Sequence, residues 1–150
     1  MVSLADIITE NEVAVDVQTK DWREAIKTAG ELLVREGAVA PSYVNAMIRI
    51  VEELGPYIIV APGVAMPHAR PEDGALKVAI SIVKLREAVI FPGGEDNPIN
   101  LILALAALDK NSHVQVMASL ADILNDDAIL MELKVASSKK DILDIIKKKS

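Results

Sequence analysis

An uninterrupted apolar run of eight residues, 101–108, is the feature that most limits how this chain can fold. It belongs to a stretch, 99–107, in which positions of both parities are apolar, which is typical of a strand buried on both faces. A strand of this kind needs a covering layer above and below it. The run is less than half of the roughly 20 residues that a membrane-spanning helix requires. We therefore expect the apolar excess to form a core and not to cross a membrane.

Further strands are predicted before this one. Residues 12–17 and 76–85 alternate between apolar and polar positions with period two, which is typical of a half-buried strand. Residues 57–61 form a short apolar run between a Gly-Pro and a Pro-Gly pair, which indicates a buried strand. Residues 88–91 end in a Pro-Gly-Gly loop that is either mobile or part of a binding rim. The first strand is expected to place three valines on one face: Val13, Val15 and Val17.

Amphipathic helices are predicted between and after these strands, because apolar residues recur at three- and four-residue spacing. Capping residues and Gly or Pro stops place them at about 3–9, 21–37, 41–55, 113–124, 126–133 and 138–145. The helix near 113 is expected to start with a capping box of Ser112 and Gln115, so that His113 is at or near its first position. The lysines at 147–149 are expected to form a solvated tail.

The alternation of strands and helices, with one strand buried on both faces, predicts an α/β fold. We expect a three-layer α/β/α sandwich with a mixed central sheet and helices on both faces. A length of 150 residues predicts a single domain, 1–150, that is large enough to fold without a structural metal or disulfide.

Composition excludes several classes of protein. A net charge of −6, with one Trp, two Tyr and one Phe, provides neither the basic surface nor the stacking platform of a nucleic-acid binder. The absence of cysteine removes disulfides, iron–sulfur sites and thiol catalysis. The N-terminal residues lack the basic stretch and apolar core of a secretory signal. We therefore expect a cytoplasmic protein that is not itself inserted in a membrane.

His68 is one of only two histidines, and it follows the predicted strand at 57–61. Pro67 and Pro71 stiffen the backbone around it, and Arg70 lies two residues after it. An isolated histidine in a loop is more often a surface or structural residue than a catalyst. Its position alone therefore does not assign it a function.

The second histidine, His113, stands where the central strand gives way to a helix. Amide groups and the helix dipole at such a junction attract anions, which would suit a phosphoryl group. The same dipole disfavours a protonated imidazole, so we expect His113 to be neutral. The alternative is that it caps its own helix or faces solvent. Because each histidine follows a predicted buried strand, the two are expected to meet at one edge of the sheet.

Three chemistries fit a histidine pair without cysteine. A zinc site would need a third ligand at regular spacing, and Glu72, Asp73 and Asp109 are present without such a pattern. A serine hydrolase would need a G-x-S-x-G motif, which is missing. A histidine that accepts a phosphoryl group needs a neutral ring and nearby donors, which this sequence offers. No P-loop or kinase glycine loop is present, so we expect no nucleotide cofactor and a phosphate that comes from another protein.

Segments that surround both histidines resemble a known family. GVAMPH at 63–68 is similar to the P-H segment of enzyme IIA domains of the mannitol/fructose class, in the bacterial phosphoenolpyruvate-dependent phosphotransferase system. Residues 55–57, 69–74 and 103–113 resemble the ascorbate-specific branch. The likeness extends from about residue 21 to residue 124.

The resemblance implies roles for the site residues. His68 would accept a phosphoryl group from the carrier protein HPr and pass it to a cysteine of enzyme IIB, while His113 supports the group. Where mannitol-type members carry an arginine ahead of the active histidine, this sequence has Glu52. Either the helix face differs, or Arg70 supplies the positive charge.

Our leading hypothesis is thus a phosphotransferase subunit that serves sugar uptake, with ascorbate as the expected sugar. The alternatives are a regulatory phospho-acceptor of the same fold that acts by binding proteins, and a two-histidine metal-binding protein. An apolar rim of Val64, Met66 and Pro67 around His68 is expected to give both partner proteins a docking surface.

Overall fold

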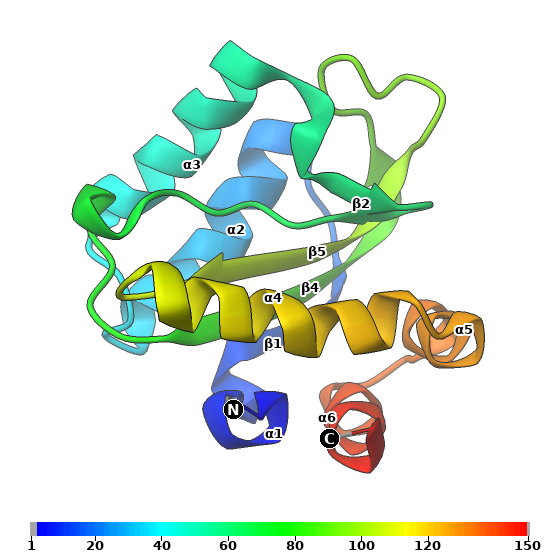
Figure 1. Ribbon diagram of the computed structural model, residues 1–150. Helices are drawn as coiled ribbons and strands as arrows, with labels where there is room; N and C mark the ends of the chain where they lie inside the picture. The colour runs from blue at the N-terminus through cyan, green and yellow to red at the C-terminus, as the bar shows by residue number, and fades with distance from the viewer. Residues whose placement is uncertain (1–2, 150) are drawn as a thin grey trace.

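A computed structural model describes residues 3–149 of the chain, so Met1, Val2 and Ser150 of the predicted 1–150 domain lie outside the described residues (Figure 1). Five strands form one sheet in the order β1-β4-β5-β3-β2. Helices cover both faces of this sheet, with α2 and α3 on one side and α4 on the other. The predicted three-layer α/β/α sandwich is confirmed.

The sheet is mixed, as predicted. Strands β4 and β5 pair antiparallel along most of their length, whereas β1 runs parallel to β4 and β3 runs parallel to β5. The short strand β2 pairs antiparallel with β3. The bounds are β1 Val13–Val17, β2 Ile59–Ala61, β3 Val64–Ala65, β4 Ala79–Val89 and β5 Ile99–Ala106.

Six α-helices and three short 3-10 turns connect these strands within residues 3–149. The helices are α1 Leu4–Ile7, α2 Trp22–Arg35, α3 Pro41–Leu54, α4 Lys110–Leu124, α5 Asp127–Val135 and α6 Lys139–Lys149. The turns are η1 Glu10–Glu12, η2 Pro56–Ile58 and η3 Pro71–Asp73. None of the helices among the described residues combines the length and the apolar character of a membrane span.

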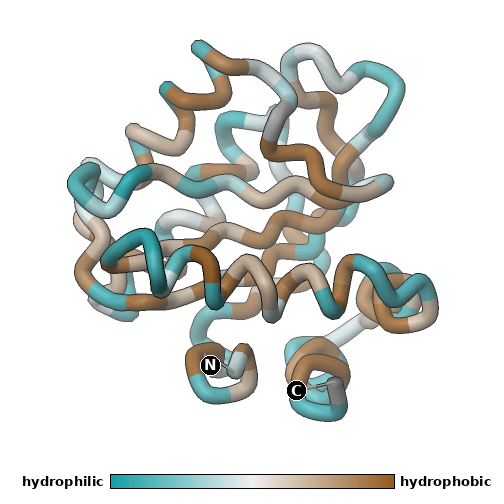
Figure 2. Tube along the Cα trace, viewed as in Figure 1, coloured by the Kyte–Doolittle hydropathy of each residue, from teal (hydrophilic) through white to brown (hydrophobic). Residues whose placement is uncertain are grey.

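Strand β5 is buried on both faces and separates two hydrophobic cores. Leu101, Leu103 and Leu105 pack in the core beneath α4, α5 and α6, whereas Ile102 and Ala104 pack against α2 and α3. Figure 2 shows hydrophobic residues along the sheet strands and hydrophilic ones at the outer turns. Full burial of a leucine side chain contributes about 2 kcal/mol. The apolar run at 101–108 thus determines the three-layer arrangement.

The expectation that three valines of the first strand share a face is wrong. Val13 and Val15 pack in the core beneath α4, but Val17 packs in the core beneath α2. The pairing register with β4 shifts between Ala14 and Val17, and Asp16 has φ 55°. This irregularity makes the side chain of Val17 face the opposite side of the sheet from Val13 and Val15. A period-two pattern in the sequence does not reveal such a shift.

The expectation of a buried strand at 57–61 is also wrong. Its first part is the 3-10 turn η2, and the remainder, β2, is an edge strand in which Val60 is exposed. The buried strand that precedes His68 is β3, which the turn at Gly63 (φ 78°) places between β2 and β5. A short apolar run does not distinguish a central strand from an edge strand, because both bury part of their side chains.

Two boundaries also differ from the prediction. The strand predicted at 76–85 is β4, which starts only at Ala79 and continues to Val89, so that it includes the first residues of 88–91. The lysines at 147–149 continue helix α6 and do not form a tail, although Lys147 and Lys148 are exposed. The Lys148 ammonium lies 3.3 Å from the Glu132 carboxylate of α5. Cations at a helix C-terminus are favourable for the helix dipole, which explains why the helix continues through them.

Candidate functional site

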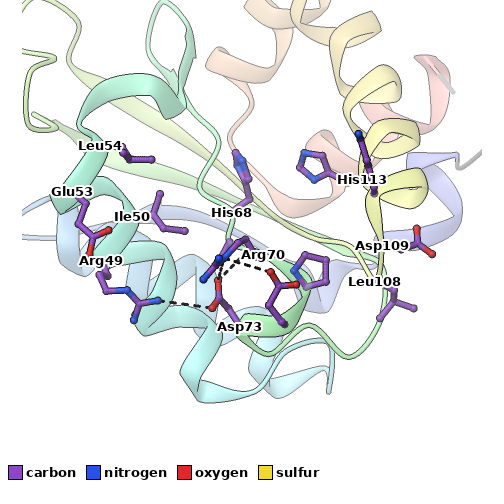
Figure 3. Close-up of a pocket in the computed structure, with 14 residues that line it drawn as sticks. Arg49, Ile50, Glu53, Leu54, His68, Arg70, Asp73, Leu108, Asp109 and His113 are labelled. Carbon is purple, nitrogen blue, oxygen red and sulfur yellow. Dashed lines mark hydrogen bonds and ion pairs between the residues drawn. The ribbon is translucent and has the colours of Figure 1, made fainter.

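A pocket of about 750 Å³ lies where α3, the segment after β3 and the start of α4 come together (Figure 3). Its lining includes both histidines and Arg70, which are the three residues singled out from the sequence. Strands β3 and β5 run parallel and both end beside this pocket. Sites in open α/β sheets commonly form at such strand ends, where the following loops diverge.

The segment that carries His68 is held to the sheet by hydrogen bonds of the main chain. Leu105 N–H of β5 donates to the Pro67 carbonyl at 3.1 Å, so the chain continues along β5 beyond the end of β3. On the other side of His68, Ala69 N–H donates to the Tyr43 hydroxyl at 3.0 Å. Pro67 and Ala69 are both buried. The backbone on both sides of the histidine is therefore fixed.

Tyr43 of α3 is a positioning residue that the sequence analysis missed. Its side chain is fully buried, and its hydroxyl lies 2.8 Å from the Leu105 carbonyl as well as accepting from Ala69 N–H. The hydroxyl thus joins the His68 segment, β5 and α3. The signal in the sequence is a tyrosine on the apolar face of an amphipathic helix, where a phenolic group needs a partner.

The His68 ring is oriented by its own loop. Its Nδ1 lies 3.0 Å from the Met66 carbonyl oxygen. A carbonyl can only accept a hydrogen bond, so Nδ1 carries a proton, and in the neutral ring the lone pair is then on Nε2. This is the tautomer in which Nε2 can act as a nucleophile.

Helix α4 begins earlier than predicted. Asp109, not Ser112, is its N-cap: the Asp109 carboxylate accepts from Ser112 N–H at 2.8 Å, and the Ser112 hydroxyl accepts from Asp109 N–H at 3.2 Å. The predicted box of Ser112 and Gln115 is therefore wrong, since Ser112 is the last residue (N3) of the box and not its first. The hydrogen bond from Ser112 N–H also lowers the pKa of Asp109. His113 is consequently the fourth helical residue and does not cap the helix.

The two histidines meet as expected. Their ring centroids are 5.3 Å apart and the ring planes are inclined by 46°. Burial lowers the pKa of His113 from its ordinary value of 6.5, and the nearby His68 lowers it further. At neutral pH His113 is therefore an uncharged imidazole that faces a second ring across the pocket.

Ion pairs form the opposite side of the pocket (Figure 3). Asp73 lies 3.5 Å from Arg70 Nε and 3.9 Å from Arg49 Nη2, and Arg70 Nε also lies 3.5 Å from Glu72. Arg70 thus enters the pocket with its charge shared between two carboxylates. Arg49 of α3 was not singled out from the sequence, because nothing in a helical pattern shows which charged positions face a distant loop.

Glu52, which stands where an arginine was expected, does not line this pocket. Its carboxylate lies 3.1 Å from Arg23 of α2, so it faces the neighbouring helix. Arg49, three residues earlier on the same helix, lines the pocket instead. The face of α3 that lines the pocket therefore carries Arg49 and not Glu52, and Arg70 lines the same pocket.

The predicted apolar rim is wrong in its residues. Val64, Met66 and Pro67 are buried in the core and offer no surface to a partner. The exposed apolar side chains at the pocket are Leu54 at the end of α3 and Leu108 before α4, which are 65% and 50% exposed. Among residues 3–149 no three or more His, Cys, Asp or Glu side chains are grouped so that they could hold a metal ion.

Comparisons with known proteins cover almost the whole chain. The family model described as "Phosphoenolpyruvate-dependent sugar phosphotransferase system, EIIA 2" matches residues 6–149. The chain is 42% identical over 143 residues to the mannitol-specific cryptic phosphotransferase enzyme IIA component of Escherichia coli (strain K12), over 95% of this chain and 97% of that protein. It is 33% identical over 145 residues to the ascorbate-specific PTS system EIIA component of the same strain, over 95% and 94%.

Solved structures show the same fold. The solution structure of the mannitol-specific cryptic enzyme IIA from Escherichia coli matches with a TM-score of 0.91 and 41% identity, over 98% of this chain and 99% of that one. Enzyme IIA in a complex of mannitol IIA with phosphorylated mannitol IIB from Escherichia coli matches with a TM-score of 0.82 and 30% identity, over 94% and 97%.

Proposed function

Because the chain belongs to the EIIA 2 family of the phosphoenolpyruvate-dependent sugar phosphotransferase system, we propose that it carries a phosphoryl group on His68. Components of this kind are phosphotransferases that serve sugar transport. We further propose that residues 1–150 form a single domain, that the donor is phosphorylated HPr and that the acceptor is a cysteine of enzyme IIB. The observation that carries the proposal is the His68 ring, whose Nδ1 is hydrogen bonded to Met66 and which faces the neutral His113.

The transfer needs no metal or nucleotide. His68 Nε2 attacks the phosphorus of the phosphohistidine on the donor, and a new N–P bond forms while the donor's N–P bond breaks and its electron pair returns to the donor ring. The Nδ1 proton stays on His68, held by the Met66 carbonyl. In the second step a thiolate of the acceptor attacks the same phosphorus, and His68 leaves as a neutral ring. Positioning and charge stabilisation provide most of the catalysis in such transfers.

The remaining pocket residues stabilise the phosphoryl oxygens in this proposal. His113 can donate one hydrogen bond as a neutral ring, and it becomes a better donor if the phosphoryl group raises its pKa. Arg49 and Arg70 supply positive charge from the opposite side of the pocket. Leu54 and Leu108 provide exposed apolar surface on which HPr and enzyme IIB would dock in turn. A complex with phosphorylated IIB is known for the similar mannitol IIA, which supports IIB as a partner.

Ascorbate remains our prediction for the sugar, but the similar proteins include both mannitol-specific and ascorbate-specific components. A cysteine acceptor requires a compartment that keeps thiols reduced, so the proposal includes a cytoplasmic location. To decide the sugar class, the phosphorylated chain would be mixed separately with purified IIB of a mannitol transporter and of an ascorbate transporter. The rate of phosphoryl transfer to each IIB would then be measured. Faster transfer to the mannitol-type IIB would contradict the ascorbate prediction.

The function itself is tested with phosphoenolpyruvate, enzyme I and HPr, followed by mass measurement. The wild type should gain one phosphoryl group and His68→Ala should gain none. His113→Gln serves as the control for a general effect of histidine removal, and it should still be phosphorylated, more slowly. A wild type that gains no phosphate would contradict the proposal. Phosphate that transfers to neither IIB would favour the regulatory phospho-acceptor.

A further inference from the structure

Asp73 occupies a central place among the charges of the pocket. Its carboxylate contacts both arginines, with Oδ2 at 3.5 Å from Arg70 Nε and Oδ1 at 3.9 Å from Arg49 Nη2. Oδ2 also accepts a hydrogen bond from Arg70 N–H at 3.0 Å. The Asp73 side chain is only 13% exposed, whereas that of Glu72 is 67% exposed. Asp73 is therefore the more firmly held of the two carboxylates that pair with Arg70.

The backbone keeps this carboxylate in place independently of the arginine side chains. Asp73 N–H donates to the Arg70 carbonyl at 2.9 Å, which closes the 3-10 turn η3. The Asp73 carbonyl accepts from the Ser42 hydroxyl at 3.0 Å, which ties the turn to α3. The guanidinium groups are free to turn by comparison, since the side chains of Arg49 and Arg70 are 53% and 70% exposed.

Charge balance changes when His68 is phosphorylated. Arg49 and Arg70 bring two positive charges that pair with Asp73 and Glu72, and the lining also carries Glu53, Asp109 and Lys110. A phosphoryl group adds between one and two negative charges and oxygens that accept strong hydrogen bonds from arginine. Because His68 and both arginines line the same pocket, such a group would compete with Asp73 for the two guanidinium groups.

We propose that Asp73 is a positioning residue that holds Arg49 and Arg70 while His68 is unphosphorylated, and that its charge weakens their attraction for the phosphoryl group. This inference rests on the proposed function. A carrier must release the group as readily as it accepts it, and arginines without a competing anion would stabilise the phosphorylated form too strongly. Interactions that stabilise the phosphorylated form more than the transition state slow the transfer of the phosphoryl group to the next protein. Asp73 thus adjusts the phosphoryl-transfer equilibrium.

The decisive variant is Asp73→Asn, which retains an oxygen that can accept from Arg70 N–H and removes only the charge. We expect the equilibrium constant for phosphorylation by phospho-HPr to rise about five- to tenfold, because a like charge has left the neighbourhood of the phosphoryl group. The rate of transfer to enzyme IIB should fall by a similar factor. A purely structural role for Asp73 predicts the opposite sign, namely weaker phosphorylation together with poorer folding.

Glu52→Gln is the matched control, because it removes the same charge from α3 at a position outside the pocket. Its equilibrium constant should stay within about twofold of the wild type, since exposed charges at a distance are screened. Should Asp73→Asn fail to fold, Glu72→Gln decides: it removes a charge from Arg70 at an exposed position, and we expect a shift of the same sign, about twofold to threefold.

The inference is overturned if a folded Asp73→Asn variant shows an unchanged or lowered equilibrium constant. If only Glu72→Gln folds, an unchanged equilibrium constant in that variant overturns it. Either result leaves the proposed function intact. A wild type that takes no phosphate from HPr would instead overturn the proposed function, and this inference with it.

Discussion

The two sides of the pocket are built from different interactions. The side that carries His68 is held by hydrogen bonds between neutral, buried groups, with Tyr43 and Leu105 as the partners of residues 67–69. The side that carries the charges, Arg70–Asp73 and Arg49, is held by partly exposed ion pairs. A buried hydrogen bond left unmade costs about 1–3 kcal/mol, whereas an exposed ion pair contributes about 0–1 kcal/mol. The His68 segment is therefore fixed, and the charged side chains around it can rearrange.

Two neighbouring residues of α3 test this difference, because Tyr43 anchors the His68 side and Ser42 anchors the charged side. Tyr43→Phe leaves Ala69 N–H without its buried partner, so we expect the free energy of unfolding to fall by about 1–3 kcal/mol. Ser42→Ala removes an exposed hydrogen bond and should change it by less than about 0.5 kcal/mol. Denaturant unfolding of both variants checks this, and equal losses would contradict the contrast.

Removal of an arginine should affect chemistry and leave stability unchanged. We expect Arg49→Gln to lower the rate of phosphoryl acceptance about tenfold, and Arg70→Gln about threefold, because Arg70 is the more exposed of the two and is shared by two carboxylates. Unfolding free energies should stay within about 0.5 kcal/mol of the wild type. Rapid-quench kinetics with phospho-HPr measures the rates. If Arg70→Gln accepts the phosphoryl group at the wild-type rate, Arg70 has no role in the transfer.

The pKa of His113 provides a test of the histidine pair that requires no partner protein. Burial, and then the charge of His68, hold this pKa below 6.5. The folded chain therefore binds fewer protons than the unfolded chain just below pH 6.5, so the contribution of His113 to stability is complete above that pH and is lost as the pH falls below it. NMR titration of His68→Gln should show a higher pKa for His113 that still lies below 6.5. An unchanged pKa would show that the rings do not interact.

Salt should produce the smallest effect on stability. Raising the ionic strength from 0.1 to 1 M shortens the Debye length from about 10 Å to about 3 Å and weakens the exposed ion pairs of the charged side. Because hydrogen bonds of buried groups hold the His68 side, we expect the thermal midpoint to change by no more than about 2 °C in sodium chloride. A circular dichroism melt in both buffers measures this. A large loss of stability would show that the ion pairs hold the pocket together.

Much of the fold and part of the site could be predicted from the sequence. The double-sided apolar strand at 99–107 correctly predicted layers on both faces. The expected proximity of His68 and His113 is also confirmed, although the strand that precedes His68 is β3 and not 57–61. Local patterns were sufficient here because burial leaves a periodic trace in the sequence. The roles of these residues stay predictions until they are tested by phosphorylation.

Other features depended on contacts between distant segments. Tyr43 and Arg49 belong to the site only because α3 packs beside the His68 loop, and neither contact has a periodic signature. The cap of α4 was misplaced because Asp109 and Ser112 are both good capping residues, and the choice between them depends on where β5 ends. The turn of β1 at Asp16 likewise needs the register with β4, which a single strand does not contain.

That irregularity at Asp16 has a consequence for how copies of the chain behave toward one another. Strand β1 is an outer strand of the sheet, and a straight apolar outer strand can recruit the same strand of a second molecule. Here the backbone of β1 turns at Asp16, which has a positive φ. The Asp16 carboxylate also forms an ion pair with Arg86, whose Nε lies 2.9 Å from Oδ1, at this edge of the sheet. The opposite margin is β2, which is only three residues long. A sheet as apolar as this one is thereby protected at both margins against growth into aggregates.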